Sequence, residues 1–556
     1  FQSINRRYDI VYGDVMLNFN YNINRFDIAA TVGWTGRYEN MNNMRVSTNG
    51  GLVTENWFDL NASRYTPSST LQRMELLKTG YMGTLSLGWD NYLFLELTGR
   101  QERSSTLKDQ SFFYPSANLS FLFTQAFHMP SWWNYGKLRL SYGIVGNAPE
   151  TYTANIVYEQ GSDNGFTWNT IPSSWGNADI RPEKKYEYEI GLESKFLNNR
   201  LGIDVSYYNN RVKDQILSTP QPSTSGVKNV LMNVGEVANH GWDISISATP
   251  ILTRDFRWDL TANYGVYKNK VVKLADGVPY LEILNSGGSG IKIQAVEGQP
   301  MGDIYAQVPQ VNENGEYLVS DKGLYLNQTE LQKVGNINPA GVGGLFNSFS
   351  YKNVFLDFSI DFRIGGDVIN EMNQYATAVG LTPESLKYRD TEHGGLSYYY
   401  PGDNNSSGIP VQVDPSTGVG PNGEIIYHDG IILPGVVAST GERNTRIIPA
   451  GYYYNTTYNW GTEAEQLTYR HSVFDHSYVK LRELTIGYQF PEKMISKLGL
   501  GRLSVSVFGR NLFYFYKALK NYDAESSVGT SWANQATVGS STTATRSFGV
   551  SLRASF

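Results

Sequence analysis

Aromatic residues in the long segments between predicted strands are the side chains of this sequence best suited to hold a ligand. Aromatic faces stack on sugar rings and also grip peptide side chains, so such rings could form part of a binding vestibule. The nine candidate substrate-binding residues are Trp168, Trp175, Tyr398, Tyr399, Tyr400, Tyr452, Tyr453, Tyr454 and Trp460. For each of them, packing within the loops or contact with a partner protein is the structural alternative.

Patterns that carry catalysis or metal binding are missing from the sequence. The six histidines are scattered, and His393 follows Glu392 without the His-x-x-x-His spacing of a zinc site. Neither a Gly-x-Ser-x-Gly elbow nor a phosphate-binding Gly-Lys-Ser/Thr loop occurs. Residues 312–316 resemble a calcium loop only faintly, and their composition favours a plain turn. We therefore predict a protein that is not an enzyme and that holds neither a cofactor nor a metal.

Composition excludes several classes of protein. The chain has 39 Tyr and 55 Gly, and its net charge is −6 with 18% charged residues. A mildly acidic chain without a basic patch does not look like a nucleic-acid binder. No run of 18 apolar residues exists, which argues against a transmembrane helix. Because there are 0 cysteines, a disulfide scaffold and a Cys-bound metal site are also excluded.

Strict alternation of apolar and polar residues is the dominant pattern of the chain. In the last stretch, Phe548, Val550, Leu552 and Ala554 alternate with small or polar residues. Residues 15–21 and 26–34 repeat this pattern on the two sides of a short turn at residues 23–25. A period of two puts apolar and polar side chains on opposite faces of a strand. We count about 15 such strands along the chain.

The connections between these strands alternate between short turns and long loops. The long segments include residues 148–182, 273–345 and 367–471, and residues 39–71 also show no period of two. Outer-membrane barrels have short periplasmic turns and long extracellular loops, whereas soluble sandwiches do not need such alternation. The sequence therefore predicts an all-β fold, a transmembrane antiparallel up-and-down β-barrel, with its apolar face toward lipid and its polar face toward the lumen.

Strand parity gives a further expectation about domains. Bacterial single-chain barrels have an even number of strands and both ends in the periplasm. An odd count that ends in the periplasm begins outside the cell. We therefore predict that residues 1–556 form the C-terminal portion of a longer barrel, without its N-terminal plug and first strands. Such a piece is not expected to close a barrel alone, because unpaired backbone groups are costly in lipid.

Nine stretches in one order resemble the SusC-like branch (SusC/RagA family) of the TonB-dependent outer-membrane transporters of Bacteroidetes. The matching stretches are residues 99–123, 137–147, 181–208, 233–241, 297–302, 336–339, 477–482, 508–512 and 522–525. The last stretch departs from the family's Asp-Pro-Glu, since Ala524 replaces the proline. None of the nine is specific alone, but their order over residues 99–556 is specific.

The resemblance implies a barrel of about 22 strands with an N-terminal plug and an energy-coupling TonB box. It implies an outer-membrane active importer of oligosaccharides that works with a SusD-like surface lipoprotein and with TonB–ExbB–ExbD through the missing N-terminal region. A peptide importer of the same family and a passive porin-like barrel are the alternatives. A soluble all-β binding protein is a weaker alternative. Dependence of the purified protein on detergent would exclude it.

Overall fold

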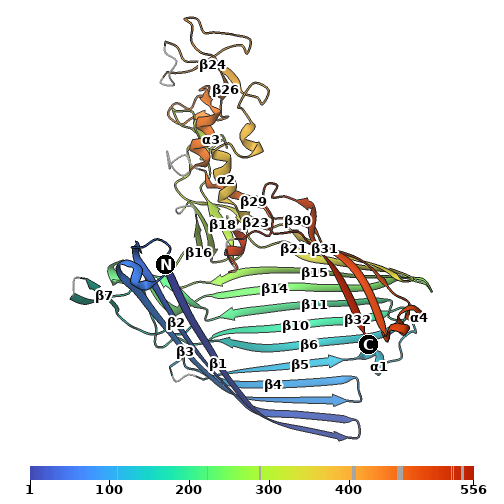
Figure 1. Ribbon diagram of the computed structural model, residues 1–556. Coiled ribbons are helices and arrows are strands. Elements are labelled where there is room, and N and C mark those ends of the chain that lie inside the picture. The colour runs from blue at the N-terminus through green and yellow to red at the C-terminus, as the bar shows by residue number, and fades with distance from the viewer. Residues whose placement is uncertain are drawn as a thin grey trace. The chain divides into compact units, whose positions relative to one another are not determined.

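A sheet of 15 strands is the main feature of the computed structural model, and its strand order follows the chain order (Figure 1). The structure describes residues 1–108, 111–163, 166–221, 223–286, 290–402, 408–459, 468–527, 529, 531–539 and 544–556. The sheet confirms the predicted count of about 15 strands. Its strands are β1 (Gln2–Ile23), β2 (Phe26–Leu52), β3 (Ser63–Trp89), β4 (Leu93–Ser104), β5 (Ser111–Phe121), β6 (Trp133–Asn147), β10 (Glu183–Phe196), β11 (Leu201–Lys213), β14 (Glu236–Leu252), β15 (Phe256–Lys273), β21 (Gly341–Tyr351), β22 (Val354–Ile364), β30 (Tyr478–Gln489), β31 (Arg502–Lys517) and β32 (Ser547–Ser555).

The chain divides into two compact units, which are described separately. The first unit contains residues 1–247 and 267–279, and the second contains residues 248–266 and 280–556. Within each unit, consecutive strands of the large sheet pair antiparallel, as β1 does with β2 and β31 with β32. This is the up-and-down arrangement that the alternation predicts.

Tight turns join the strands at one end of the sheet. Asn24, Asp90 and Asn91 adopt positive φ angles of 52°, 50° and 60°. Asn and Asp tolerate this left-handed conformation better than other non-glycine residues, and it suits two-residue hairpin turns. At the same end, an aromatic cluster runs from Trp89 and Tyr92 to Phe121. Aromatic belts of this kind lie at the boundary between membrane and water.

Cross-strand register places the apolar residues on one face of the first unit. One row crosses seven strands and consists of Phe19, Ala30, Leu85, Leu97, Ala117, Tyr142 and Tyr188. Leu17, one row away, exposes 71% of its surface. A contiguous exposed apolar face of this size needs a nonaqueous neighbour. In the second unit, Phe548 and Val550 are exposed by 73% and 72% in the same way.

Residues 39–71, whose sequence shows no period of two, form strands over most of their length. β2 continues to Leu52 and β3 begins at Ser63, and the two strands pair from Tyr38↔Leu77 to Ser47↔Ser68. Side-chain alternation disappears there because Asn, Ser and Thr occupy both faces. The backbone hydrogen bonds of the hairpin nevertheless continue, since they do not depend on side-chain polarity.

The long loops contain secondary structure of their own. In the first unit these elements are β7 (Glu159–Asp163), β8 (Phe166–Thr170), β9 (Ser174–Trp175), β12 (Ile216–Pro220) and β13 (Asn229–Asn233), whereas α1 (Phe123–Ala126) lies in the short connection between β5 and β6. In the second unit they are β16 (Tyr280–Ser286), β17 (Ile291–Val296), β18 (Asp303–Ala306), β19 (Leu318–Val319), β20 (Gln332–Asn336), β23 (Asp367–Ile369), α2 (Glu371–Ala378), β24 (Leu396–Tyr399), β25 (Val411–Gln412), β26 (Tyr427–Ile431), β27 (Val436–Val437), β28 (Ile448–Pro449), α3 (Ala450–Tyr458) and β29 (Val473–Asp475). The short connection between β30 and β31 contains α4 (Glu492–Ile495).

The loops of the second unit share a hydrophobic core, and we call the described parts of residues 280–340 and 365–477 the cap. Ile291, Ile304, Ile369 and Val473 are each at most 6% exposed and belong to one cluster. β23 pairs with β29, so the two ends of the segment 367–475 meet. These loops are therefore packed structure rather than extended connections.

Candidate functional site

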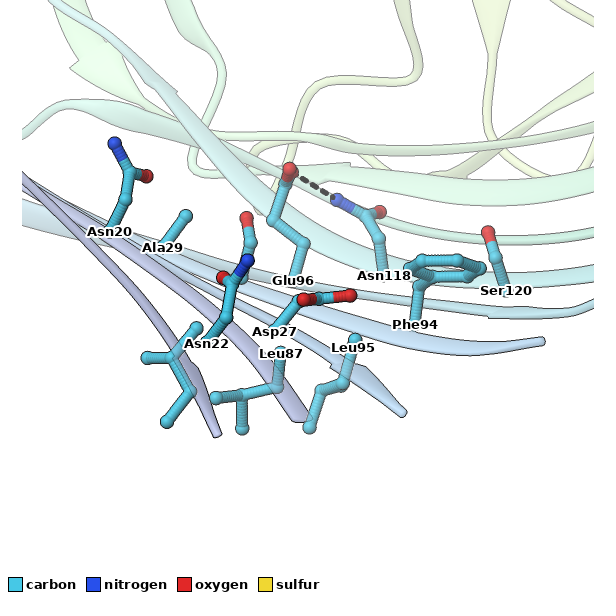
Figure 2. Close-up of a pocket in the computed structure, with 13 residues that line it drawn as sticks. Asn20, Asn22, Asp27, Ala29, Leu87, Phe94, Leu95, Glu96, Asn118 and Ser120 are labelled. Atoms are coloured by element: carbon cyan, nitrogen blue, oxygen red, sulfur yellow. Dashed lines mark hydrogen bonds between the residues drawn. The ribbon is translucent and has the colours of Figure 1, made fainter. Parts of the chain in front are cut away.

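The polar face of the first unit contains a cavity of about 620 Å³ near the tight-turn end of β1 to β5. In Figure 2, Glu96, Asn118 and Ser120 project to one side of the sheet, and Leu87 and Leu95 project to the other. The polar residues that line the cavity are Asn20, Asn22, Asp27, Ser86, Glu96, Asn118 and Ser120. Phe94 adds an aromatic ring. Because their neighbours in sequence belong to the apolar face, these side chains face the barrel interior.

Amides, hydroxyls and carboxylates give this wall both donors and acceptors. Asn118 donates from Nδ2 to Oε1 of Glu96 at 3.3 Å. One row away, Thr31 donates to Oδ1 of Asn18 at 2.8 Å. Amide and hydroxyl groups each donate and accept, so the wall can bind a ligand with the same mixture of groups.

Arg139, a cation on the same face, is neutralised by the wall itself. Nη2 of Arg139 on β6 lies 2.6 Å from Oδ1 of Asp204 on β11 and donates to Ser206. Nη1 of Arg139 lies 3.5 Å from Glu193. Bidentate guanidinium–carboxylate geometry of this kind fixes the side chains of adjacent strands. Among the residues that line the cavity no cation occurs, so its surface is mildly acidic.

The predicted site residues Tyr398 and Tyr400 lie inside the cap, and Tyr399 beside them is half-buried. Tyr398 and Tyr400 expose 1% and 5% of their surfaces and pack on each other at 5.5 Å between ring centroids. The hydroxyl of Tyr398 donates to Oδ1 of Asp429 at 3.1 Å. Burial, with the charge of Asp429, raises the pKa of Tyr398. In this conformation their ring faces contact protein atoms.

Tyr452, Tyr453 and Tyr454 belong to α3, beside a second buried cluster of the cap. Tyr452 and Tyr453 pack against this cluster, which contains Leu324 and Ile448. Tyr454 donates from its hydroxyl to the backbone oxygen of Glu384 at 2.8 Å. Burial raises the pKa of Tyr454 to about 12. The two tyrosine triplets therefore build the interior of the cap, and direct contact of these residues with cargo stays a prediction.

Two of the three tryptophans of the predicted set, Trp168 and Trp175, lie among the described residues. Trp168 on β8 is 46% exposed and pairs with Gly161 of β7. Trp175 on β9 is half-buried, and its ring centroid lies 6.2 Å from that of Tyr158. Trp460 lies outside the described residues. Sequence reasoning predicted a polar face toward the lumen but missed the cavity, since the alternation does not show where several strands leave a hollow.

The stretches that carry the family resemblance contact one another at the bases of the loops. Nδ2 of Asn233 donates to the backbone oxygen of Arg181 at 2.7 Å. Nδ2 of Asn338 donates to the oxygen of Met301 at 2.6 Å. In each case a residue of one stretch holds the backbone of another, which explains why the stretches occur together.

The loop between β31 and β32 is tied to β30 in the same manner. Glu525 accepts hydrogen bonds from Lys480 and Arg482, and Asp523 accepts one from Tyr514 at 2.6 Å. The oxygen of Ala524, which replaces the family's proline, lies 2.5 Å from Nε2 of His476. We call residues 518–527 the strap. Strap residue Leu519 packs with Val368 of β23 and with Val538, so the strap also contacts the base of the cap.

Two further observations concern the helices and the possible metal ligands of the described residues. No helix among the described residues is long and apolar enough to cross a membrane. Within the same residues, no group of three or more His, Cys, Asp or Glu side chains is placed to hold a metal ion. Oδ1 of Asn312, in the faint calcium-loop stretch, accepts from the backbone N–H groups of Asn314 and Glu316 at 3.0 and 2.9 Å, as in a turn.

Comparison with known proteins matches residues 1–302 to the family described as "TonB dependent receptor-like, beta-barrel". TonB-dependent receptor P3 of Formosa agariphila is 24% identical over 494 residues, which are 81% of this chain and 42% of the relative. TonB-dependent receptor SusC of Bacteroides thetaiotaomicron is 30% identical over 247 residues, 41% of this chain and 24% of SusC. The chain thus spans less than half of the length of these curated relatives.

Solved structures confirm the fold. The RagAB peptide transporter superposes with a TM-score of 0.65 at 18% sequence identity, covering 92% of this chain and 53% of the other. The RagAB peptide importer in the open-open state gives 0.64 at 18% identity, with 92% and 52% covered. The family match covers more than half of the chain. The fold, the strand register and the apolar face of the chain agree with a β-barrel of this family. The chain therefore belongs to the TonB-dependent receptor β-barrel family, in its SusC-like branch, and is a protein of the outer membrane.

Proposed function

We propose that this chain is the barrel part of an active importer that carries oligosaccharides across the outer membrane. The observation that supports this best is the cavity wall of Asn20, Asn22, Asn118 and Ser120 beside Phe94. Each sugar hydroxyl both donates and accepts a hydrogen bond, which matches amide and hydroxyl groups, and an aromatic ring stacks on a sugar face.

A peptide importer is the second candidate, favoured by the likeness to the structure of the RagAB peptide transporter. Peptides carry backbone amides that the same wall could bind, and the acidic residues Asp27 and Glu96 favour basic side chains. A passive porin-like barrel is the third candidate. Its lumen is open without energy coupling, so it passes small solutes in both directions.

The partners follow from the same proposal. A SusD-like surface lipoprotein would close over the extracellular loops, and TonB–ExbB–ExbD would supply energy through a plug. Long loops with packed cores, such as the cap, support a lid partner because a rigid surface loses less entropy on binding than a flexible loop does.

Uptake by cells tests the function. Cells that carry the full-length gene as their only importer of its class should accumulate a fluorescent oligosaccharide, and a proton uncoupler or deletion of TonB should abolish accumulation. Accumulation of labelled peptides but not of oligosaccharides would favour the peptide importer. Steady currents through the purified full-length protein in a planar bilayer would favour the porin and contradict the active importer.

We also propose that residues 1–556 are the C-terminal portion of a longer barrel that has an N-terminal plug. β1 has 22 residues and β32 has 9, and each has one neighbour in the sheet order. β32 is thus too short to satisfy the free edge of β1, and each unpaired backbone group in lipid costs several kcal/mol. Residues 1–556 expressed alone should give no heat-modifiable band on a gel, whereas the full-length protein should give one.

A further inference from the structure

The lipid-facing side of β6, β10 and β11 changes character toward the long-loop end. From the tight turn outward, this face of β10 contains Leu192, Ile190, Tyr188, Tyr186 and Lys184. The distance along the strand from Leu192 to Lys184 is about 27 Å at 3.3–3.4 Å per residue. A strand tilted by about 40° then crosses about 20 Å of membrane, close to the height of a barrel's apolar band. Lys184 therefore lies at the outer boundary of the membrane, just beyond two tyrosines.

Two lysines face each other directly at this boundary. Lys184 of β10 pairs with Lys213 of β11, and Tyr186 pairs with Arg211 in the adjacent row of the same face. Like charges directly opposite each other destabilise a sheet. Among the described residues, neither lysine forms an ion pair, although Nζ of Lys213 lies 5.9 Å from the ring centroid of Tyr186.

The acidic groups nearby are engaged elsewhere. Glu236 of β14 binds Arg211 at 3.1 Å, and Arg211 still exposes 57% of its side chain. Asp214 binds Arg181 at 3.3 Å. Glu187 belongs to the opposite face and binds Lys185 at 2.6 Å. The repulsion between Lys184 and Lys213 is therefore not relieved by a carboxylate of the described chain.

A groove of about 180 Å³ is lined by Lys213, one of these two lysines. Its lining residues come from three adjacent strands that Figure 1 labels β6, β10 and β11, and they are Tyr142, Tyr186, Glu187, Tyr188, Asn209, Arg211 and Lys213. Tyr142 and Tyr188 expose 47% and 45% of their surfaces. Tyrosine hydroxyls, an amide and two cations together offer the donors that a phosphate group accepts.

We propose that this groove binds the phosphate of an anionic lipid headgroup in the outer leaflet. The position fits, because the groove continues the apolar face at the level where headgroups lie. The charge fits as well, because one phosphate between Lys184 and Lys213 replaces a repulsion with two attractions. The groove lies on the lipid-facing side, away from the cavity of the proposed transport path. The proposal rests on membership in an outer-membrane family and not on the identity of the cargo.

Native mass spectrometry of the full-length protein in detergent tests this site. The probes are phosphatidylglycerol, phosphatidylcholine and inorganic phosphate, and the variants are K184Q/K213Q and, as a milder change, K213Q. A cation near a charged headgroup changes affinity by about fivefold. We expect binding of phosphatidylglycerol to fall about fivefold in K213Q and more in the double variant. Binding of phosphatidylcholine, whose phosphate is offset by its own choline cation, should fall less.

Lys352 provides the matched control, since it also lies beside a tyrosine but in a tight turn at the other end of the strands. Its Nζ lies 5.4 Å from the ring centroid of Tyr351. K352Q should leave phosphatidylglycerol binding unchanged. Equal binding by wild type and K184Q/K213Q would overturn the proposal, and so would an equal loss in K352Q. Binding of inorganic phosphate without preference for phosphatidylglycerol would show a free anion site and would overturn the assignment to a lipid.

Discussion

Nζ of Lys480 lies 2.5 Å from Oε2 of Glu525, although the two residues are 45 positions apart and belong to a strand and a loop. Lys480 is only 1% exposed, and its Nζ also lies 4.8 Å from the ring centroid of Tyr514. Arg482, two residues along the same strand, holds the second oxygen of Glu525 at 2.6 Å. A buried lysine needs such a partner, because an uncompensated buried charge is costly. The strap is therefore fixed to β30 chiefly through one carboxylate.

Replacing that carboxylate should loosen the strap. In E525Q, Lys480 loses its counter-charge, and we expect a local destabilisation of about 2 kcal/mol, typical for hydrogen bonds to charged groups. Hydrogen exchange of residues 518–527 in the full-length protein should then become about 30-fold faster. Exchange at β23 should also rise, because Leu519 packs against Val368.

E442Q is the matched control for this measurement. Glu442 is an exposed residue of the cap whose side chain has no ion pair within the part of the chain that the structure describes. Its replacement should leave exchange of the strap unchanged. If E525Q and E442Q gave the same exchange rates, the strap would be held by its backbone contacts rather than by Glu525.

Acid should release the strap only at very low pH. Burial alone would raise the pKa of Glu525, but hydrogen bonds and charges from Arg482 and Lys480 outweigh it and hold the pKa at about 2. A carboxylate with a depressed pKa stabilises the folded form above its unfolded pKa of about 4.3, and this contribution is lost as the pH falls toward 2. Strap exchange, corrected for intrinsic rates, should stay constant from pH 7 to 5 and increase below about 4. An increase between pH 7 and 5 would contradict this assignment.

His471 should make the cap sensitive to milder acid. Its ring stacks on Tyr458 at 4.4 Å between centroids, and burial, aided by the charge of Arg470, lowers its pKa to about 4. The unfolded cap binds this proton near pH 6.5, so the contribution of neutral His471 is present above that pH and is lost as the pH falls toward 4. Thermal unfolding of H471Q should depend less on pH between 6.5 and 4 than that of wild type. Equal pH slopes in both proteins would refute this role.

Adjacent residues of β1 test which face meets the lipid. Leu17 belongs to the apolar face and Asn18 to the polar face, where it accepts from Thr31. Arginine on the lipid face near the midplane costs about 2–4 kcal/mol. L17R should therefore lower the free energy of unfolding of the full-length barrel in urea by that amount, whereas N18R should change it far less. If N18R lowered the free energy of unfolding more than L17R does, the assignment of the two faces would be reversed.

The cavity wall can be tested by removing its hydrogen-bonding groups. Asn118 and Glu96 are linked at 3.3 Å and face the cavity (Figure 2). In the double variant N118A/E96A, uptake of the proposed oligosaccharide should fall about tenfold, since each lost hydrogen bond contributes about 0.5–1.5 kcal/mol. T98A, on the same face but outside the cavity lining, is the control. Equal uptake by all three proteins would place the cargo contacts elsewhere.

Sequence reasoning predicted the sheet well because its signal is local. The alternation at residues 15–21 and 26–34 appears as the antiparallel pair β1–β2, with Leu17 opposite Val32. The same reasoning failed at residues 39–71, where Asn, Ser and Thr on both faces remove the signal while backbone pairing continues. Alternation identifies a strand only where one of its faces is apolar. It gives no signal where both faces are polar.

The candidate site was less predictable for a physical reason. Tyr398 and Tyr454 were identified as aromatic loop residues, but their hydroxyls donate to Asp429 and Glu384, which are distant in the chain. The link between residues 477–482 and 522–525 shows the same limit, since spacing alone does not reveal that Glu525 meets Lys480. Contacts between loops are set by the strands that bring the loops together.

The pairing of each strand with its neighbour in the chain has a consequence for how such transporters diversify. Every long loop begins and ends on adjacent strands, as the segment between β22 and β30 does. Doubling the length of a loop whose ends are already held together costs only about 0.6 kcal/mol in closure entropy. Insertions and exchanges of whole loops can therefore accumulate over generations while the registers of the strands stay fixed. The strands of the barrel can therefore stay almost unchanged while the long loops evolve.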